Sequence, residues 1–143
     1  MNIEEMKRIK TLLFKATNEK NGSLIENYLA DTIKWHDGCD GKNGSDVIFE
    51  WPKHDFINGN ILGNGGFEKT KNIDFQIAEG DKVFTYFTVE GIHDIGKIWD
   101  YPPTGKKLRY NAQYTARFKD GLIVEMWATC DGHIILKQLG IIN

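Results

Sequence analysis

The sequence predicts a single α+β domain in which helices come first and a meander of antiparallel strands follows. Two observations carry this prediction. In the first part of the chain apolar residues recur at intervals of three and four, as in amphipathic helices. After the Gly- and Asn-rich segment 57–67 they recur at every second position, as in strands. The length of 143 residues suits one domain over residues 1–143, with no repeat or linker to divide it.

The N-terminal part is expected to be helical. Apolar residues from Ile3 to Ala16 predict an amphipathic helix that ends at Asn21-Gly22. Ser23 is a candidate N-cap for a short second helix over residues 24–29, because Glu26 follows it as in a capping box.

A short strand and a third helix are expected next. Residues 33–36 read as the strand. The third helix should contain residues 47–49, with Ser45 as its N-cap, and Pro52 should end it because proline has no amide hydrogen to donate.

Four long strands are expected over residues 67–78, 82–93, 107–118 and 123–131, with a closing helix over 134–139. The alternation is clearest in 107–118. One face of this strand is predicted to meet the core or a cavity, and it carries Leu108, Tyr110, Ala112, Tyr114, Ala116 and Phe118. The other face carries Lys107, Arg109, Asn111, Gln113, Thr115 and Arg117, and it should meet water or a second subunit.

Composition narrows the class of partner. A net charge of −2 gives no electrostatic reason to expect nucleic acid or an anionic membrane surface. The chain shows no signal-peptide pattern and no apolar stretch of membrane-spanning length, so we expect a cytoplasmic protein. Two cysteines do not make a disulfide framework. Small molecules or other proteins are the expected partners.

The segment GKIWDYPPTGKK, residues 96–107, is unusual for a connection between two strands. A loop that only turned the chain would need the glycine and one proline. Trp99 and Tyr101 are therefore candidate aromatics at the rim of a pocket, because prolines stiffen a loop and pockets favour aromatic walls. The alternative is a rigid connection whose aromatic side chains cap the core.

The second half of the chain resembles the SnoaL-like polyketide cyclase, or ester cyclase, family of the nuclear transport factor 2-like superfamily. The matching signals are Glu79-Gly80-Asp81, Gly91-x-His93, Pro102-Pro103-Thr104-Gly105, Asp120-Gly121, Glu125-x-Trp127, Asp131 and Gln138-Leu139-Gly140. Their order and spacing together are more specific than any one of them. They cover nearly half of the chain.

The resemblance implies a conical barrel, in which a curved antiparallel sheet wraps around N-terminal helices and encloses a deep apolar cavity. It also implies no cofactor, no metal and a homodimer that pairs through the outer face of the sheet. The ligand would be a small apolar or polycyclic carbonyl compound. Its expected contacts are Trp35, His36, Trp99, Tyr101, Tyr110 and Trp127.

The resemblance fails at the family's catalytic group. The resemblance to the cyclases implies a cavity aspartate that acts as general acid/base, with a histidine assisting. Alignment places Ala128 at the aspartate position and Tyr114 at the histidine position. Because an alanine transfers no proton, an enzyme of this sequence needs another group.

Three residues are candidates for that chemistry, and each has a structural alternative. Asp131, at the end of the last strand, could transfer a proton, or it could cap the final helix. His93 could shuttle a proton near neutral pH, or it could bind backbone at the rim. Tyr114 should point inward, where its hydroxyl could polarise a carbonyl or simply pack in the core.

A zinc site is a further alternative. His36-x₂-Cys39 and Cys130-x₂-His133 would supply four ligands if folding joined them, but two unrelated Asp-Gly turns explain the same residues. His54 and His133 are expected to be exposed.

Three function classes remain open at this point. The first is a cofactor-independent lyase or isomerase that uses His93, Asp131 and Tyr114 on a carbonyl compound. The second is a binding domain without chemistry, as Ala128 suggests. The third is a dimeric interaction module whose contacts are Arg109, Asn111, Gln113 and Thr115.

Overall fold

The computed structural model of the chain describes residues 1–39 and 47–143. Its helical elements are α1 (Ile3–Glu19), the 3₁₀ turns η1 (Gly22–Leu24) and η2 (Glu26–Tyr28), α2 (Lys53–Phe56), the π turn η3 (Ile57–Ile61) and α3 (Gly132–Gln138). Its strands are β1 (Leu29–Asp37), β2 (Val47–Pro52), β3 (Lys69–Glu79), β4 (Lys82–Ile92), β5 (Lys107–Lys119) and β6 (Leu122–Cys130). The predicted α+β class is confirmed.

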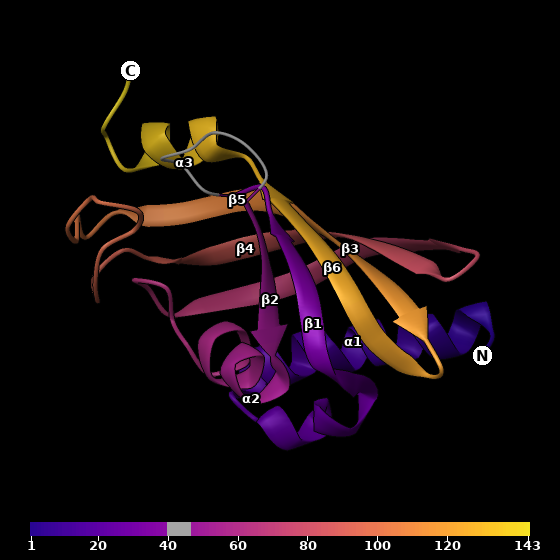
Figure 1. The fold of residues 1–143 in the computed structure, drawn as a ribbon. Helices are drawn as coiled ribbons and strands as arrows, with labels where there is room; N and C mark the ends of the chain where they lie inside the picture. Colours follow the sequence, from indigo (N-terminus) through magenta and orange to yellow (C-terminus); the bar gives the residue numbers. More distant parts are fainter. Residues whose placement is uncertain (40–46) are drawn as a thin grey trace.

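The described strands form one open, curved sheet in the order β2-β1-β6-β5-β4-β3. Neighbours are antiparallel except β1 and β6, which run parallel, so the sheet is mixed rather than purely antiparallel. Register shifts interrupt three of the pairings, and such irregularities bend strands. In Figure 1, β1 and β2 accordingly run steeply across the direction of β3 and β4.

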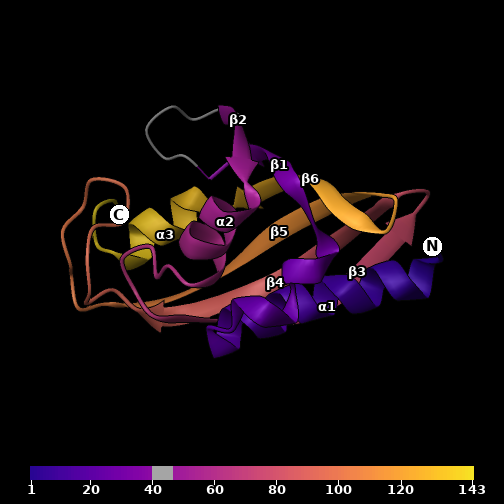
Figure 2. The same ribbon diagram turned by 60° about the horizontal axis from the view of Figure 1, so that its bottom comes forward.

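The long helix α1 covers the inner face of the curved sheet. Asn2 caps its start by accepting a hydrogen bond from the amide of Glu5 at 2.8 Å, and Lys20 ends it in a left-handed conformation. The apolar stripe of α1, with Met6, Ile9 and Leu13 among its members, is buried. Figure 2 shows α1 lying alongside β3 and β4, against which it packs.

Two of the helix predictions are wrong. The expected helix over 24–29 is a pair of 3₁₀ turns, after which β1 begins at Leu29. The expected helix around 47–49 is strand β2, in which Trp35↔Phe49 and Ile33↔Trp51 pair across to β1. Because β-branched and aromatic residues fit a pleated surface, pairing with β1 overrides the weak helical pattern of this segment.

Two boundaries next to this segment also differ from expectation. Pro52 precedes α2 instead of ending a helix, a position that suits a residue without an amide hydrogen. Ser45, the expected cap, lies outside the described residues.

The four long strands and the closing helix agree with prediction to within two residues. The alternation of β5 is also confirmed. On its inner face Leu108, Ala112 and Ala116 are buried, and Tyr114 contacts both of the chain's hydrophobic clusters.

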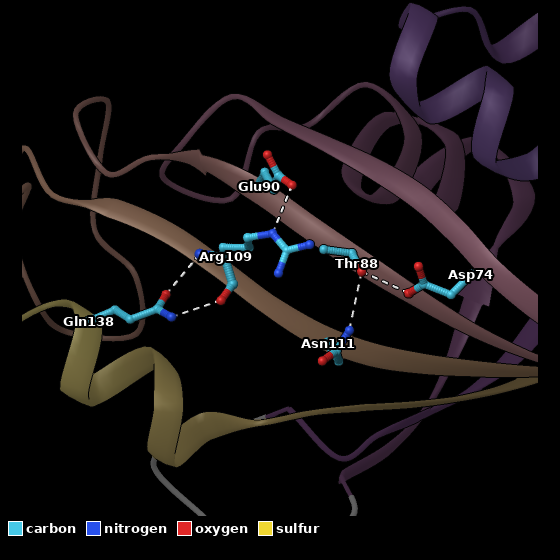
Figure 3. A network of polar contacts seen from close by, with 6 residues as sticks. All are labelled: Asp74, Thr88, Glu90, Arg109, Asn111 and Gln138. Carbon is cyan, nitrogen blue, oxygen red and sulfur yellow. Dashed lines mark hydrogen bonds and ion pairs between the residues drawn. The ribbon is translucent and has the colours of Figure 1, made fainter.

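The outer face of β3, β4 and β5 carries a ladder of polar side chains (Figure 3). Thr88 donates to Asp74 at 2.7 Å and accepts from Asn111 at 3.2 Å. Arg109 pairs with Glu90 at 3.1 Å, and α3 docks beside it through Gln138. The outer face of β5 is therefore polar, as the sequence predicts, whereas the neighbouring outer face of β3 and β4 also carries Phe75, Phe84 and Tyr86.

Among the described residues, no helix has both the length and the apolar character needed to cross a membrane.

Candidate functional site

A pocket of about 250 Å³ lies between the inner face of β3, β4 and β5, the loop that follows β4, and α3. Its apolar wall is made of Phe67, Phe87, Val89, Ile98, Trp99, Ala112 and Ile135. Its polar groups are two lysines, two tyrosines and two thiols, namely Lys69, Lys71, Tyr110, Tyr114, Cys39 and Cys130. No carboxylate is among the described residues that line it.

A larger hollow of about 690 Å³ lies at the end of the sheet where β4 finishes. It is lined mainly by exposed side chains, among them Glu68, Glu90 and Asp94. We prefer the smaller pocket as the site, since its aromatic walls and convergent polar groups are what a small-molecule site requires.

Tyr114 and Lys71 form the central polar contact of the pocket. Lys71 extends from β3, and its ammonium donates to the Tyr114 hydroxyl at 3.0 Å. The Tyr114 ring packs edge-on against Phe87, with centroids 4.7 Å apart, and lies near Phe14 and Trp35. Burial raises the pKa of Tyr114, so the phenol is protonated at neutral pH and its hydroxyl can donate.

Two lysines, Lys71 and Lys10, are buried beside this phenol, and a third, Lys69, is partly buried in the pocket wall. Burial lowers the pKa of Lys71 to about 8. Burial, reinforced by the charge on Lys71, lowers the pKa of Lys69 and that of Lys10 to about 7 each. Lys10 comes from α1, is fully buried, and places its nitrogen 5.5 Å from the centroid of the Tyr114 ring. Unlike exposed lysines, these amines can lose their proton near neutral pH.

Cys39 and Cys130 lie side by side at the pocket wall, because β1 and β6 run parallel toward them. The Cys39 thiol hydrogen-bonds to Cys130. This bond and burial both raise the pKa of Cys39, whereas the same bond lowers the pKa of Cys130 against the opposing effect of burial.

The four ligands of the zinc alternative are not brought together. His36 binds Glu125 at 2.6 Å and stacks on Trp127, on the outer face of the sheet, and His133 is exposed. In the ranges 1–39 and 47–143 no group of three or more potential metal ligands occurs.

Trp99 covers one side of the pocket. Its indole nitrogen donates to the carbonyl of Cys39 at 2.8 Å, and its ring lies over Gly132 at the start of α3. Its φ of 51° is in the left-handed region, which is uncommon for a bulky residue and tends to mark functional sites. The loop therefore supplies a pocket wall through Ile98 and Trp99, and contact of Trp99 with a ligand stays a prediction. Tyr101 is paired with Ile98 in an isolated bridge and does not line the pocket.

Tyr114 is the one member of the predicted catalytic trio that lines the pocket. His93 is fully buried in the base of the loop, where its Nε2 donates to the carbonyl of Gly96 at 2.6 Å and its Nδ1 contacts Thr104 at 3.2 Å. Asp131 is exposed and caps α3 by accepting from the amide of Ile134 at 3.1 Å. Both positions agree with the structural alternatives, a backbone contact for His93 and a helix cap for Asp131. A role in proton transfer stays a prediction for both residues.

Some of the predicted ligand-contact residues line the pocket and others do not. Tyr110 and Trp99 line the pocket. Trp35 is buried behind it, with its ring 5.8 Å from that of Tyr114. His36 and Trp127 lie on the opposite face of the sheet, so their predicted contact with a ligand gains no support from their position.

Sequence reasoning missed Lys69 and Lys71. A signal was present, because both precede Ile73 at alternating positions of β3 and so belong to its inward face. A lysine that alternates with apolar residues is readily read as an edge-strand charge, which is why the signal went unused.

The family model of SnoaL-like polyketide cyclase matches residues 10–139. A comparison with curated proteins finds no match.

Solved structures share the fold. AclR from Streptomyces galilaeus, described as a candidate hydroxylase, is 22% identical with a TM-score of 0.77, and the match covers 99% of this chain and 100% of AclR. IdmH from Streptomyces antibioticus, described as a candidate polyketide cyclase, is 24% identical with a TM-score of 0.76, over 94% of this chain and 97% of IdmH. A SnoaL-like protein from Jannaschia sp. CCS1 is 15% identical with a TM-score of 0.75, over 97% and 93%.

Proposed function

Because the chain belongs to the SnoaL-like polyketide cyclase family, we propose that it is a cofactor-independent lyase or isomerase that performs acid/base chemistry on a small apolar carbonyl compound. The observation that carries this proposal is the hydrogen bond between Lys71 and Tyr114 inside an aromatic pocket. It supplies a proton-transfer pair in a chain that has Ala128 where the family's aspartate is expected.

The two side chains suit complementary roles. The protonated Tyr114 hydroxyl donates to the substrate's carbonyl oxygen and stabilises the negative charge that develops there. The Lys71 amine, with its pKa near 8, accepts the proton from the carbon next to the carbonyl and returns it later. Ala128 lies directly opposite Tyr114 in the β5–β6 pairing, so no carboxylate stands beside the phenol at this position.

The size of the pocket restricts the substrate. At about 250 Å³ it is smaller than the roughly 300–1,000 Å³ of ordinary ligand pockets. A carbonyl compound with one or two rings is therefore favoured over a larger polycyclic one. The walls formed by Phe87, Trp99 and Tyr110 suit an aromatic ring.

Exchange of hydrogen for deuterium tests the proposal without a known substrate. In D₂O the protein should accelerate exchange at the methyl group of acetophenone, followed by NMR, because enolate formation is the shared first step. Tyr114→Phe and Lys71→Met should each slow this exchange by about 10²-fold or more. Asn27→Ala, in an exposed turn, is the matched control and should leave the rate unchanged. Exchange no faster than in buffer would refute acid/base chemistry.

A binding domain without chemistry is the second candidate, and Ala128 is the observation that favours it. A binding domain should bind acetophenone saturably in calorimetry, and Trp99→Ala should remove the binding heat. The methyl protons of acetophenone should then exchange no faster than in buffer.

A further inference from the structure

We propose that Lys71 is also a nucleophile, and that its amine condenses with an aldehyde or ketone in the pocket to form a Schiff base. This proposal rests on the proposed function in one respect, namely that a carbonyl compound enters the pocket of Tyr114. It goes beyond that function because it assigns covalent catalysis to a lysine.

The position of Lys71 is the first argument. Although it comes from the edge strand β3, Lys71 is only 8% exposed and lines the pocket, so its nitrogen faces the pocket and little water. Aromatic groups surround it, with its nitrogen 5.1 Å from the centroid of the Tyr114 ring. An amine that water solvates poorly is more readily deprotonated, and only the neutral amine attacks a carbonyl.

The hydroxyl of Tyr114 is the second argument. The Lys71 nitrogen donates to this oxygen at 3.0 Å, and no carboxylate is among the described residues that line the pocket to hold the ammonium form. A phenol at this distance can pass a proton to the oxygen of the carbonyl under attack. Amine and proton donor are thus already arranged around one point of the pocket.

The other two lysines are less suited to the same reaction. Lys69 donates to the carbonyl of Asn64 at 2.7 Å and lies over the Phe67 ring at 4.3 Å, so its nitrogen is committed away from Tyr114. Lys10 is fully buried behind the phenol and is not among the lining residues. Lys71 is therefore the amine that a bound carbonyl group meets.

The reaction balances without an added oxidant or reductant. The nitrogen lone pair forms a bond to the carbonyl carbon, and the carbonyl electrons move to oxygen, which takes the proton of Tyr114. The nitrogen then returns one proton to the Tyr114 phenolate, and the hydroxyl group takes that proton from Tyr114 and leaves as water. The iminium nitrogen gives its remaining proton back to Tyr114, so a C=N bond remains and the phenol is restored. One carbonyl compound and one amine thus give one imine and one water.

Reductive trapping tests the proposal on the wild-type chain. The protein is incubated with benzaldehyde and sodium cyanoborohydride at pH 8, and the site of the added benzyl group is mapped by peptide mass spectrometry. We expect one benzyl group per chain, on Lys71, formed at least about 10-fold faster than on any exposed lysine. Benzylation spread evenly over exposed lysines, or centred on Lys69, would overturn the proposal.

Variants separate nucleophile from proton donor. Lys71→Met should abolish the fast phase, and Lys71→Arg, which keeps the charge, should abolish it equally. Lys69→Met should retain fast trapping on Lys71. Tyr114→Phe should slow trapping at Lys71 by about 10-fold or more, because the leaving oxygen loses its proton donor. Circular dichroism establishes that each variant is folded, and mapping on the wild-type chain decides the matter if one is not.

Failure of this proposal can be told apart from failure of the proposed function. If acetophenone exchange is accelerated but Lys71 is not trapped, Lys71 acts only as a base and the Schiff base is excluded. If neither occurs, both proposals fall. If Lys71 is trapped but exchange runs at the buffer rate, the nucleophile stands and acid/base catalysis through an enolate does not.

Discussion

Asp131 illustrates how one side chain can match a catalytic pattern and yet have a structural place. It follows the last strand, three residues beyond the position of the family's aspartate, but its Oδ1 accepts from the Ile134 amide and it does not line the pocket. A capping oxygen requires only an acceptor, whereas proton transfer requires a carboxyl group. Substitution by an amide therefore distinguishes the two roles.

We expect Asp131→Asn to keep both stability and acetophenone exchange, and Asp131→Ala to lower the free energy of unfolding by about 1 kcal/mol, measured with urea. Asparagine retains the capping oxygen and alanine does not. A large loss of exchange in Asp131→Asn, with unchanged stability, would instead restore the predicted catalytic role.

His93 shows the same ambiguity at the start of the loop between β4 and β5. Its backbone amide donates to the carbonyl of Lys106 at 2.9 Å, and its own carbonyl accepts from Gly105 at 2.7 Å. The ring adds its bond to Gly96, so this one residue ties both ends of the loop that carries Trp99. A substitution here would displace a pocket wall even if His93 transfers no proton.

At the scale of elements, the sequence motifs that predicted the fold turn out to join elements to one another. A Cβ atom at Gly91 would lie 2.4 Å from the carbonyl oxygen of Glu68, so the backbone of β4 passes too close for any side chain. Asp120 and Gly121 both have positive φ in the β5–β6 turn. Gln138 joins α3 to β5. Residues that form tight turns or hold two elements together have recognisable types and spacings, which is why the fold could be predicted from them.

Gln138 completes the edge that β6 leaves uncovered. The last pair between β5 and β6 is Ala112↔Cys130, so β6 ends before it reaches Arg109 of β5. There the side-chain amide of Gln138 accepts from the Arg109 backbone amide and donates to the Arg109 carbonyl, each at 2.8 Å (Figure 3). Gln138→Ala should lower the free energy of unfolding by about 1–2 kcal/mol, since two hydrogen bonds are lost. Urea denaturation measures this.

The matched control is Lys137→Ala, which removes an exposed side chain from the same helix and should change stability by less than about 0.5 kcal/mol. Equal losses in the two variants would mean that helix propensity, and not the amide contact, accounts for the effect.

The candidate site could be predicted only in part, because it is formed by side chains from different strands. Tyr110, Tyr114 and Trp99 were found because strand alternation and the unusual loop point to them. Lys69 and Lys71 lie on β3, outside the family signals, and their meaning depends on Tyr114, which is two strands away in the sheet. A contact between strands separated by more than forty residues has no local pattern in the sequence.

At the scale of the whole molecule, we propose that two copies pair through the outer face of the sheet. Gln113 lies on this face of β5 and accepts from Thr129 of β6 at 2.7 Å. Gln113→Arg should yield monomers in sedimentation velocity, because a symmetric interface would bring the new charge close to its counterpart. Asn27→Arg, in an exposed turn, should sediment as the wild type does. An unchanged sedimentation coefficient for Gln113→Arg would exclude this face.

The lowered pKa values of three lysines lead to a last prediction, which concerns how the stability of the fold depends on pH. Lys10, Lys69 and Lys71 have lowered pKa values of about 7 to 8, against 10.5 in the unfolded chain. Between these values the unfolded chain binds more protons than the folded one, so the free energy of unfolding must rise with pH. The rise should begin near pH 7, with up to about 1.4 kcal/mol per pH unit from each lysine.

Two tyrosines set the upper limit of this rise. Burial raises the pKa of Tyr110 and that of Tyr114 above the ordinary value of 10, so beyond pH 10 the unfolded chain loses protons that the folded chain keeps. Stability should then fall again. Urea midpoints measured from pH 6 to pH 11 should therefore pass through a maximum near pH 10.

Lys10→Met isolates one contributor to this curve. The nitrogen of Lys10 is fully buried, has no hydrogen-bond partner among the described residues, and faces the charge of Lys71 and the rings of Phe14 and Tyr114. Replacing it with methionine should raise the free energy of unfolding by about 1–3 kcal/mol at pH 7 and reduce the slope above pH 7. Lys15→Met, on the exposed side of α1, should change neither. A slope that stays the same in Lys10→Met would show that the Lys10 amine is charged in the folded protein at neutral pH.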